Sequence, residues 1–588
     1  MDVKYEILSA PPEDGKRRKG PSLVTLSSAF LGGLLLLGGA LKFYAHRTLS
    51  LSPFWTAPGS SVRGSSSYTP HDIYYNLTMS QAWRNPGVLA FRHYFSQTWN
   101  DGAAGVTTYP ILPRANWTSV LNTSDQWGLK WYGDHCTTPL FDGFYGTIWI
   151  RPSPERKRPY HLVSSDEADI EDMLDSETSP EHVTIYNYQH RTYDNVLSQL
   201  QYDGYDPYCL QSVLINGKGR VHCKPDGVDD IDGEPIDSHG CVKQPSGAVG
   251  YPECTPTYAD YEIIETKSRR WMMMNFINNG LEHPWRVSID SHKMWVVAND
   301  AGFVDPQEVD IITLRNGQRL TVLIKLNQPP NDYAIRFHAL SKKQSLQGYA
   351  LLRYPHRRTG TLLGAPMPRP PQPPSAMHLN AAPKPHATLL SEPHLRPYPP
   401  TPPPAVASTT LHMRARGAPD PHNPFITNYT LNGAPWQLWR VLRAPLVLRP
   451  DSELRGPNPA VRGLPLGGVV DIVVENELGE ALVMYKHNEP TWLLGAGEGP
   501  YPGAQALNLE DPVLGFFHEL PARGWMVVRW RVWQPAMTMF HVFNAKQFVM
   551  GMQVPMFEGD DHWPEVPESV SGRPHVEFEM PERMGIFD

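Results

Sequence analysis

Short runs with the composition of β-strands recur between turn signals along most of this chain. Examples are GTIWI at 146–150, MWVV at 294–297, LTVLI at 320–324 and VVDIVV at 469–474. Short strands rich in β-branched and aromatic residues are typical of two-sheet sandwiches. The 60 prolines and 17 tryptophans among the 588 residues fit an all-β protein with long loops. We therefore predict an all-β chain with two or three domains behind its tails.

The N-terminus carries the pattern of a membrane anchor. Residues 21–41 have no charge, and about 20 apolar residues suffice to span a bilayer as a helix. The basic run KRRK at 16–19 precedes them, which predicts that the N-terminus stays cytosolic. A cleaved signal peptide is the alternative. We expect the bulk of the chain in a secretory lumen or outside the cell, and three segments before it: a cytosolic tail at 1–20, a transmembrane signal anchor at 21–44 and a stalk at 45–70.

Two further features fit an oxidising, glycosylating compartment. Four N-glycosylation sequons lie beyond the predicted anchor, at Asn76, Asn116, Asn122 and Asn428. Four cysteines fall within one segment and are expected to form disulfides: Cys209, Cys223, Cys241 and Cys254. Cys136 is left as a free thiol or a packed small hydrophobic residue.

Composition also indicates the domain boundaries and argues against nucleic acid as a partner. Residues 366–404 are dense in proline, a composition expected to form an extended linker without a core. The domains are predicted at 71–152, 153–365 and 405–588. The net charge of -8 argues against binding to nucleic acid.

Several longer motifs resemble one family. DGAAGVT at 101–107 is similar to the laccase pattern DGxxGVTQxPIxP, and WYGDH at 131–135 is similar to WYHSH. SVLINGKG at 212–219 and SIDSHKMWV at 288–296 are similar to runs of the second laccase domain. The run WMVVRWRVWQP at 525–535, near the end of the chain, resembles the last strands of the third laccase domain. Together they resemble ascomycete laccases, the multicopper oxidases of conidial-pigment and polyketide pathways. The resemblance implies three cupredoxin-like Greek-key β-sandwich domains, the first of them truncated here.

The same resemblance shows which copper ligands are missing. The family holds four coppers through four histidine motifs. The HWHG motif is replaced by VLAF at 88–91, and the HPxHxH motif reads LVMYKH at 482–487. The HCHxxxH motif begins at His541, has Val542 in place of its cysteine, and ends at Gln547. No cysteine follows Cys254, and a blue-copper site needs a thiolate.

Three histidines remain at motif positions: His135, His487 and His541. In the family these positions together hold one copper of the paired type-3 centre. We therefore expect them to converge and to bind either no metal or one copper or zinc ion, as in His₃ sites. Alternatively, they are remnants that hydrogen bonds satisfy around an aromatic plug. Asp134 and Glu489 adjoin two of them in sequence, but strand alternation aims their side chains elsewhere.

Three functions remain open. The first is a repurposed non-redox enzyme of pigment or polyketide biosynthesis, in which these histidines catalyse acid–base chemistry on a small aromatic or phenolic intermediate. Its pocket would be lined by Trp131, Tyr132, Tyr485, Trp492 and Phe543. The second is a residual oxidoreductase with one metal. The third is an inactive, membrane-tethered protein that binds an active oxidase, other enzymes of the pathway or a pigment intermediate. His292 and Met272–Met274 are interpreted as structural.

Overall fold

The computed structural model describes most of the chain beyond residue 101 and three short strands before it. The described residues are 2–6, 73–76, 89–92, 102–109, 118–122, 126–135, 140–203, 209–243, 253–267, 269–355, 375–420, 424, 426–436, 445–448, 459–563, 565, 566 and 568. The predicted anchor (21–44), the stalk (45–70), Asn116 and Cys136 therefore lie outside them. Among the helices in the described ranges, none has the length and apolar character needed to cross a bilayer.

The first domain contains two three-stranded sheets, ordered β2-β1-β4 and β3-β5-β6. The strands are β1 (Asp2–Glu6), β2 (Ile73–Asn76), β3 (Leu89–Arg92), β4 (Thr118–Asn122), β5 (Gly128–Asp134) and β6 (Tyr145–Ile150). β1 belongs to the tail that was expected to be separated from this domain by a membrane, but it pairs with β2 and β4. The placement of residues 2–6 thus differs from the expectation, because the run DVKYE alternates strand-forming Val and Tyr with polar residues and can extend a sheet.

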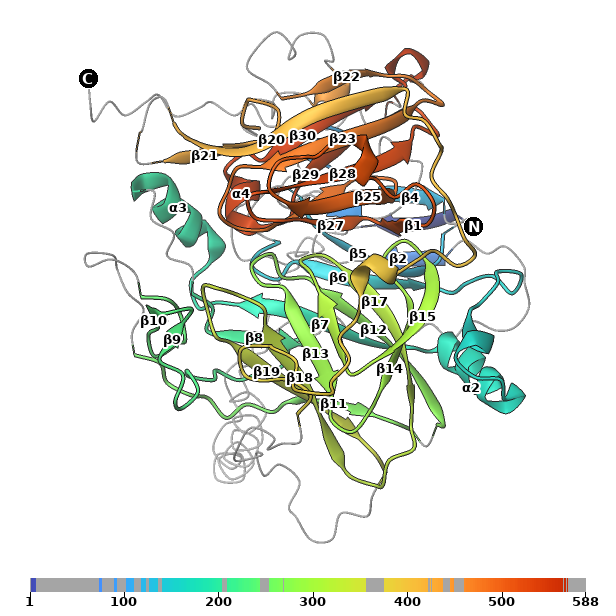
Figure 1. Cartoon of the computed structure of the whole chain (residues 1–588), viewed down its shortest axis with the longest axis vertical. Helices are drawn as coiled ribbons and strands as arrows, with labels where there is room; N and C mark the ends of the chain where they lie inside the picture. Colours follow the sequence, from blue (N-terminus) through green and yellow to red (C-terminus); the bar gives the residue numbers. More distant parts are fainter. Residues whose placement is uncertain are drawn as a thin grey trace, which may run out of the picture.

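The second domain is a sandwich of two sheets, drawn in green in Figure 1. One sheet has the order β11-β19-β18-β13-β16 and the other β15-β14-β17-β12-β7-β8. Apolar side chains of both sheets, such as Phe276, Trp285 and Phe337, fill the space between them. Its elements are β7 (Glu181–Tyr188), α3 (Tyr193–Asp203), β8 (Ser212–Ile215), β9 (Asp230–Ile231), β10 (Glu234–Pro235), β11 (Glu262–Glu265), β12 (Trp271–Asn278), β13 (Trp285–Ile289), β14 (Met294–Ala298), β15 (Phe303–Val309), β16 (Ile311–Leu314), β17 (Arg319–Lys325), β18 (Asp332–Ala339) and β19 (Gln347–Arg353).

The third domain is a second sandwich, drawn in orange and red in Figure 1. Its sheets have the orders β21-β20-β23-β28-β25-β26 and β22-β30-β29-β24-β27. Non-consecutive strands are neighbours in both, so the chain crosses repeatedly between the sheets. Its elements are β20 (Thr409–Pro419), β21 (Thr427–Thr430), η5 (Leu446–Leu448), β22 (Val461–Leu464), β23 (Val469–Asn476), β24 (Leu482–Lys486), β25 (Thr491–Glu498), η6 (Ala504–Ala506), β26 (Val513–Gly515), β27 (Phe517–Leu520), β28 (Gly524–Arg531), β29 (Ala536–Val542), α4 (Ala545–Val549), β30 (Gln553–Glu558) and η7 (Asp560–His562).

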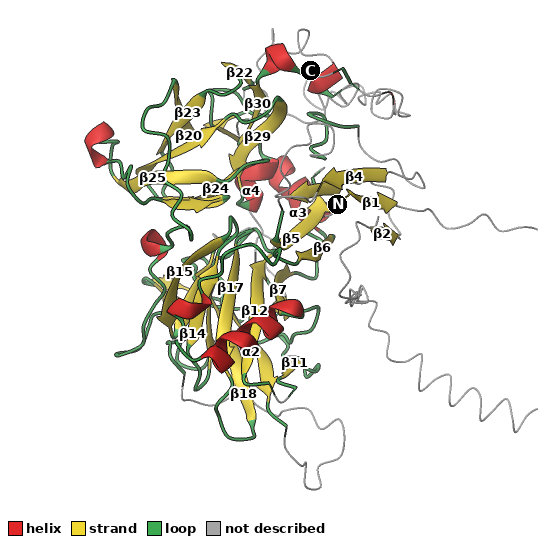
Figure 2. Cartoon of the chain, turned by 90° about the vertical axis from the view of Figure 1, so that its right-hand side faces the viewer, coloured by secondary structure: helices red, strands yellow, loops and turns green. Residues whose placement is uncertain are grey.

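Helices contribute little to the described structure, as Figure 2 shows. η2 (Tyr160–Leu162) and α2 (Glu167–Thr178) connect the first two domains. The side chain of Asp166 caps α2 by accepting a hydrogen bond from the backbone N–H of Ala168. The all-β prediction thus holds in its coarse form, a mostly β fold.

The first domain packs against the third, and this packing positions the candidate site. Leu129, Trp131 and Leu140 of the first domain belong to the same apolar cluster as Tyr485 and Phe543 of the third. The ring centroids of Trp131 and Phe543 lie 6.0 Å apart with a steep angle between the rings. Full burial of each such side chain contributes roughly 1.5–3 kcal/mol, so the contact holds the two domains together.

The proline-rich segment is not a free spacer in its described part, residues 375–404. Leu390 and Leu395 belong to the core cluster of the second domain, and Met377 is 2% exposed. η3 (Glu392–His394) lies in this segment, and Glu392 forms an ion pair with Arg315. The expectation that this segment contributes nothing to a core is wrong here, because apolar side chains between the prolines anchor it to the sandwich.

Both expected disulfides are present, as Cys209–Cys241 and Cys223–Cys254. The structural interpretation of the methionine run also holds, since Met272 and Met274 belong to the second core. His292 is 6% exposed, and its two ring nitrogens contact the carbonyl oxygen of Asp290 and the hydroxyl of Tyr354.

Candidate metal centre

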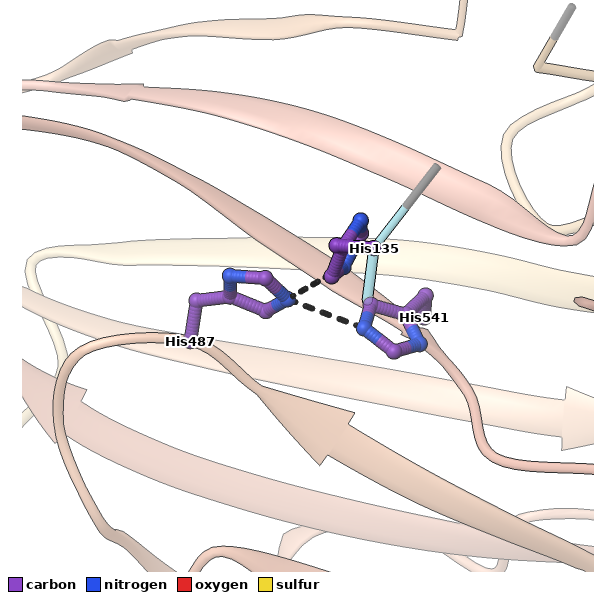
Figure 3. Close-up of side chains that lie close together, drawn as sticks. All are labelled: His135, His487 and His541. Atoms are coloured by element: carbon purple, nitrogen blue, oxygen red, sulfur yellow. Dashed lines mark hydrogen bonds between the residues drawn. The ribbon is translucent and has the colours of Figure 1, made fainter. Parts of the chain in front are cut away.

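Three strands bring the three motif histidines together, as Figure 3 shows. His135 directly follows β5 of the first domain, His487 directly follows β24, and His541 lies in β29. β24 and β29 are antiparallel neighbours, with Tyr485 opposite His541. The expected convergence of the three side chains is therefore present, although they come from two domains.

The ring nitrogens that face each other are all Nε2. Those of His135 and His487 lie 3.2 Å apart, and those of His487 and His541 lie 2.9 Å apart. The three residues form a group in which one ligand atom from each lies within 4.8 Å of the others. Tetrahedral bonds of about 2.0–2.1 Å place two nitrogens about 3.3 Å apart, so small movements would suit one ion.

Hydrogen-bond chemistry constrains this cluster. Nδ1 of His541 lies 2.7 Å from the carbonyl oxygen of Val542. A carbonyl only accepts, so Nδ1 carries the proton and Nε2 of a neutral His541 presents a lone pair. Nε2 of His487 has at most one proton and cannot donate it fully to both His135 and His541. One cation bound between the three rings would satisfy all the lone pairs.

The cluster is deeply buried and surrounded by aromatic rings. His135, His487 and His541 are 5%, 1% and 0% exposed. The ring of Phe548 in α4 has its centroid 5.0 Å from that of His541, and the ring of Tyr485 has its centroid 4.9 Å from that of His487. These contacts exclude water and would strengthen binding of a charged group.

The expected hollow pocket is not formed by its five predicted residues. Trp131, Tyr485 and Phe543 lie beside the histidines but are at most 1% exposed, so they fill the space. Tyr132 alternates with Trp131 and lies across Gly146 instead. Trp492 packs in a separate cluster, where its Nε1 donates to the carbonyl of Thr401. The prediction was wrong for these two because sequence proximity to a motif does not fix the face of a strand.

Four positions of third-domain copper ligands carry buried side chains that cannot provide a thiolate or an imidazole. Leu482, Val542 and Phe543 are 0% exposed and belong to the large apolar cluster of the third domain. Gln547 is 2% exposed, and its amide donates to Glu480.

A second group of buried polar residues adjoins the three histidines, and it was not predicted from the sequence. Nζ of Lys486 lies 2.9 Å from Glu558, and both side chains are 1% exposed. Lys486 also donates to the carbonyl oxygen of His487, at 2.9 Å. Burial and the neighbouring Glu558 raise the pKa of Glu489 to about 8, although Lys486 opposes this. A lysine inside the apolar run LVMYK was the available sequence signal, because a buried lysine needs an anionic partner.

The remaining predicted residues lie away from the centre. Asn428 is half-buried in β21, and its amide nitrogen donates to Asp420, at 2.7 Å. Asn76 and Asn122 are in β2 and β4. Neither Asp134 nor Glu489 belongs to the group formed by the three histidines.

Comparison with family patterns covers all three domains. Patterns described as "Multicopper oxidase" match residues 92–155, 182–357 and 419–562. A laccase of Pestalotiopsis fici is 32% identical over 530 residues, which are 84% of this chain and 86% of that protein. The multicopper oxidase elcG of Phaeosphaeria nodorum is 26% identical, over 80% of this chain and 81% of its own length.

Solved structures share the fold. The laccase of Botrytis aclada superimposes with a TM-score of 0.63 at 16% identity, covering 85% of this chain and 82% of that one. Fet3p, described as a multicopper oxidase that functions in iron import, gives a TM-score of 0.64 at 14% identity, with coverages of 85% and 86%. At these identities the likeness establishes the cupredoxin-like architecture only.

Proposed function

This chain belongs to the multicopper oxidase family, and from that premise we propose that it serves fungal secondary metabolism with a single metal centre in place of four coppers. The main observation in support is the close approach of three Nε2 atoms: that of His487 lies 3.2 Å from that of His135 and 2.9 Å from that of His541. Relatives named as multicopper oxidases, such as CTB12 of Cercospora beticola, support the family but leave this chain's reaction open.

The four-copper set does not fit the residues present. A blue copper requires a thiolate, and Val542 stands where the family has its cysteine. Leu482 and Gln547 replace the two histidines of that site, while Tyr485 and Phe543 replace ligands of the cluster. We therefore derive no four-electron reduction of oxygen for this chain.

One copper or zinc ion does fit. His135, His487 and His541 would hold it through Nε2, and the bond from Nδ1 of His541 to the carbonyl of Val542 fixes the required tautomer. When bound, such an ion would supply a Lewis acid. The surrounding rings of Tyr485 and Phe548 exclude water from the three imidazoles.

Elemental analysis of the purified chain after loading with zinc or copper tests the proposal. We expect one ion per chain, lost in His487→Gln and retained in the control His292→Gln, which changes another buried histidine. The apparent melting temperature should rise with metal concentration in the wild type and in His292→Gln but not in His487→Gln, because a ligand that binds only the folded state stabilises it. No ion bound by the wild type after loading would contradict the proposal.

The second candidate is non-redox acid–base catalysis on a small aromatic or phenolic intermediate. The observation that favours it is the same row of imidazoles at hydrogen-bond distances, which can pass a proton from ring to ring. Replacement of His487 and His541 by Ala should lower product formation roughly 10²- to 10⁴-fold. Full rescue of a deletion strain by that double variant would leave the third alternative, an inactive partner of other pathway enzymes.

We further propose that residues 21–44 anchor the chain in a membrane with the N-terminus cytosolic, a topology in which residues 2–6 do not pair with β2 and β4 as they do in the described structure. The uncharged run and the preceding basic residues support this. The bulk would then lie in the secretory lumen or outside the cell, where Asn76, Asn116, Asn122 and Asn428 are glycosylation acceptors. The two disulfides fit such a compartment.

A further inference from the structure

A small pocket lies where the first and second domains meet, outside the histidine centre. Leu140 and Phe141 of the first domain form one wall. Asn187 near the end of β7 and Asn279 just after β12 form the opposite side. These two strands are parallel neighbours, so their ends lie at one edge of the sheet.

Buried amide groups line this pocket, and several of their polar atoms have no hydrogen-bond partner among the described residues. Asn187 is 6% exposed and neither atom of its amide makes such a bond, whereas Asn279, which is 0% exposed, interacts with the side chain of Tyr145. Oε1 of Gln189, in the same lining, also has no such partner. Each unsatisfied buried polar atom costs roughly 1–3 kcal/mol, so the three at Asn187 and Gln189 indicate that something binds there.

The local backbone is built to accommodate this arrangement. A Cβ added at Gly280 would lie 2.1 Å from Oδ1 of Asn187, so only glycine permits the amide at that place. The hydroxyl of Tyr186 donates to the carbonyl of Phe141, at 2.7 Å, and fixes the opposite wall. The ring of Phe141 stacks on that of Tyr193 with centroids 4.1 Å apart.

The size and chemistry of the lining define the ligand. The enclosed part takes about one water-sized group, such as a hydroxyl. The two amide oxygens of Asn187 and Gln189 exceed the capacity of one hydroxyl, which donates only once. The aromatic wall at Phe141 and Tyr193 suits a ring. We propose that this pocket binds a small neutral ring with adjacent hydroxyl groups, one of which inserts between Asn187 and Asn279.

This proposal does not depend on the histidine centre. Phe141 contacts Phe548, with centroids 6.3 Å apart, and Phe548 contacts His135 and His541. A bound ring would therefore lie one aromatic layer away from the three imidazoles. The pocket is a separate site that remains testable if those histidines bind nothing.

Isothermal titration of the full chain with catechol and with glucose tests the proposal and separates an aromatic from a saturated ring. We expect one of them to bind the wild type, while 1,2-dimethoxybenzene, which lacks O–H donors, does not. Asn187→Leu keeps the side-chain shape and should weaken binding roughly 5- to 100-fold. Gln189→Met provides a second variant if Asn187→Leu does not fold, and Asn327→Leu, at an exposed position, is the control.

Three outcomes would overturn the proposal. The first is no binding of either ring by the wild type. The second is binding that is equally strong in Asn187→Leu, Gln189→Met and the control. The third is a crystal structure of the protein soaked with catechol or glucose that shows only water at the amides of Asn187 and Asn279.

Discussion

Replacing Glu489 by Gln should make the protein more stable at alkaline pH. Glu489 is 2% exposed, and its carboxylate interacts with the backbone of Trp533, which favours the charged form. Burial, together with the nearby Glu558, raises the pKa of this carboxyl from 4.5 to about 8. Between these two values the folded chain keeps a proton that the unfolded chain has released. Stability therefore falls as pH rises through this window, because the folded state binds more protons.

The magnitude follows from the gap between the two pKa values. At about 1.4 kcal/mol per pKa unit, ionisation of Glu489 above pH 8 costs the wild type roughly 3–5 kcal/mol. A glutamine at 489 has no charge to bury. The free energy of unfolding of Glu489→Gln should match that of the wild type near pH 5 and exceed it by that amount near pH 9.

Urea unfolding followed by tryptophan fluorescence from pH 5 to 9 measures this difference. Glu498→Gln is the control, since Glu498 is exposed at the end of the neighbouring strand β25. Its curve should follow the wild type at every pH. Parallel curves for Glu489→Gln and the wild type would refute the argument, and would mean that Lys486 compensates the ionised carboxylate fully.

Four further outcomes are expected. Lys486→Met should lower the free energy of unfolding in urea by roughly 3–5 kcal/mol, because it leaves Glu558 buried without its cation. Replacing both Cys209 and Cys241 by Ser should cost about 3–4 kcal/mol in the same assay, from a loop with a sequence separation of 32. Copper-loaded protein should show no intense blue absorption, since no thiolate is available at Val542. Endoglycosidase treatment of the expressed full chain should lower its mass on a gel, and an unshifted, cytosolic product would contradict the proposed topology.

The fold could be predicted from the sequence because its signal is local and repeated. Runs such as 320–324 and 469–474 became β17 and β23, both nearly fully buried. The convergence of His135, His487 and His541 was also predictable, because the resemblance to laccase motifs places them at positions that together hold one copper in that family. Burial of strands in a two-sheet core then leaves few alternative positions.

Other features depend on contacts that spacing alone does not reveal. The segment 375–404 reads as a spacer by composition, yet Leu390 and Leu395 find a place in the second core. The pairing of Lys486 with Glu558 joins residues 72 positions apart, on strands that are not hydrogen-bonded neighbours. Asn187 and Asn279 meet only because β7 and β12 are parallel. In each case the tertiary partner, and not the local pattern, decides the role of the residue.

Strand alternation places two buried polar centres on opposite sides of one strand end. His487 faces the other two histidines, whereas the preceding Lys486 faces Glu558. The two centres are linked through the backbone, because Lys486 donates to the carbonyl oxygen of His487 and Nζ is itself held by Glu558. A lysine that loses this partner would release the carbonyl and allow the imidazole ring to shift. In the proposed single-metal site, three nitrogens must lie within tenths of an ångström of their required distances, so loss of the ion pair should weaken binding of the ion.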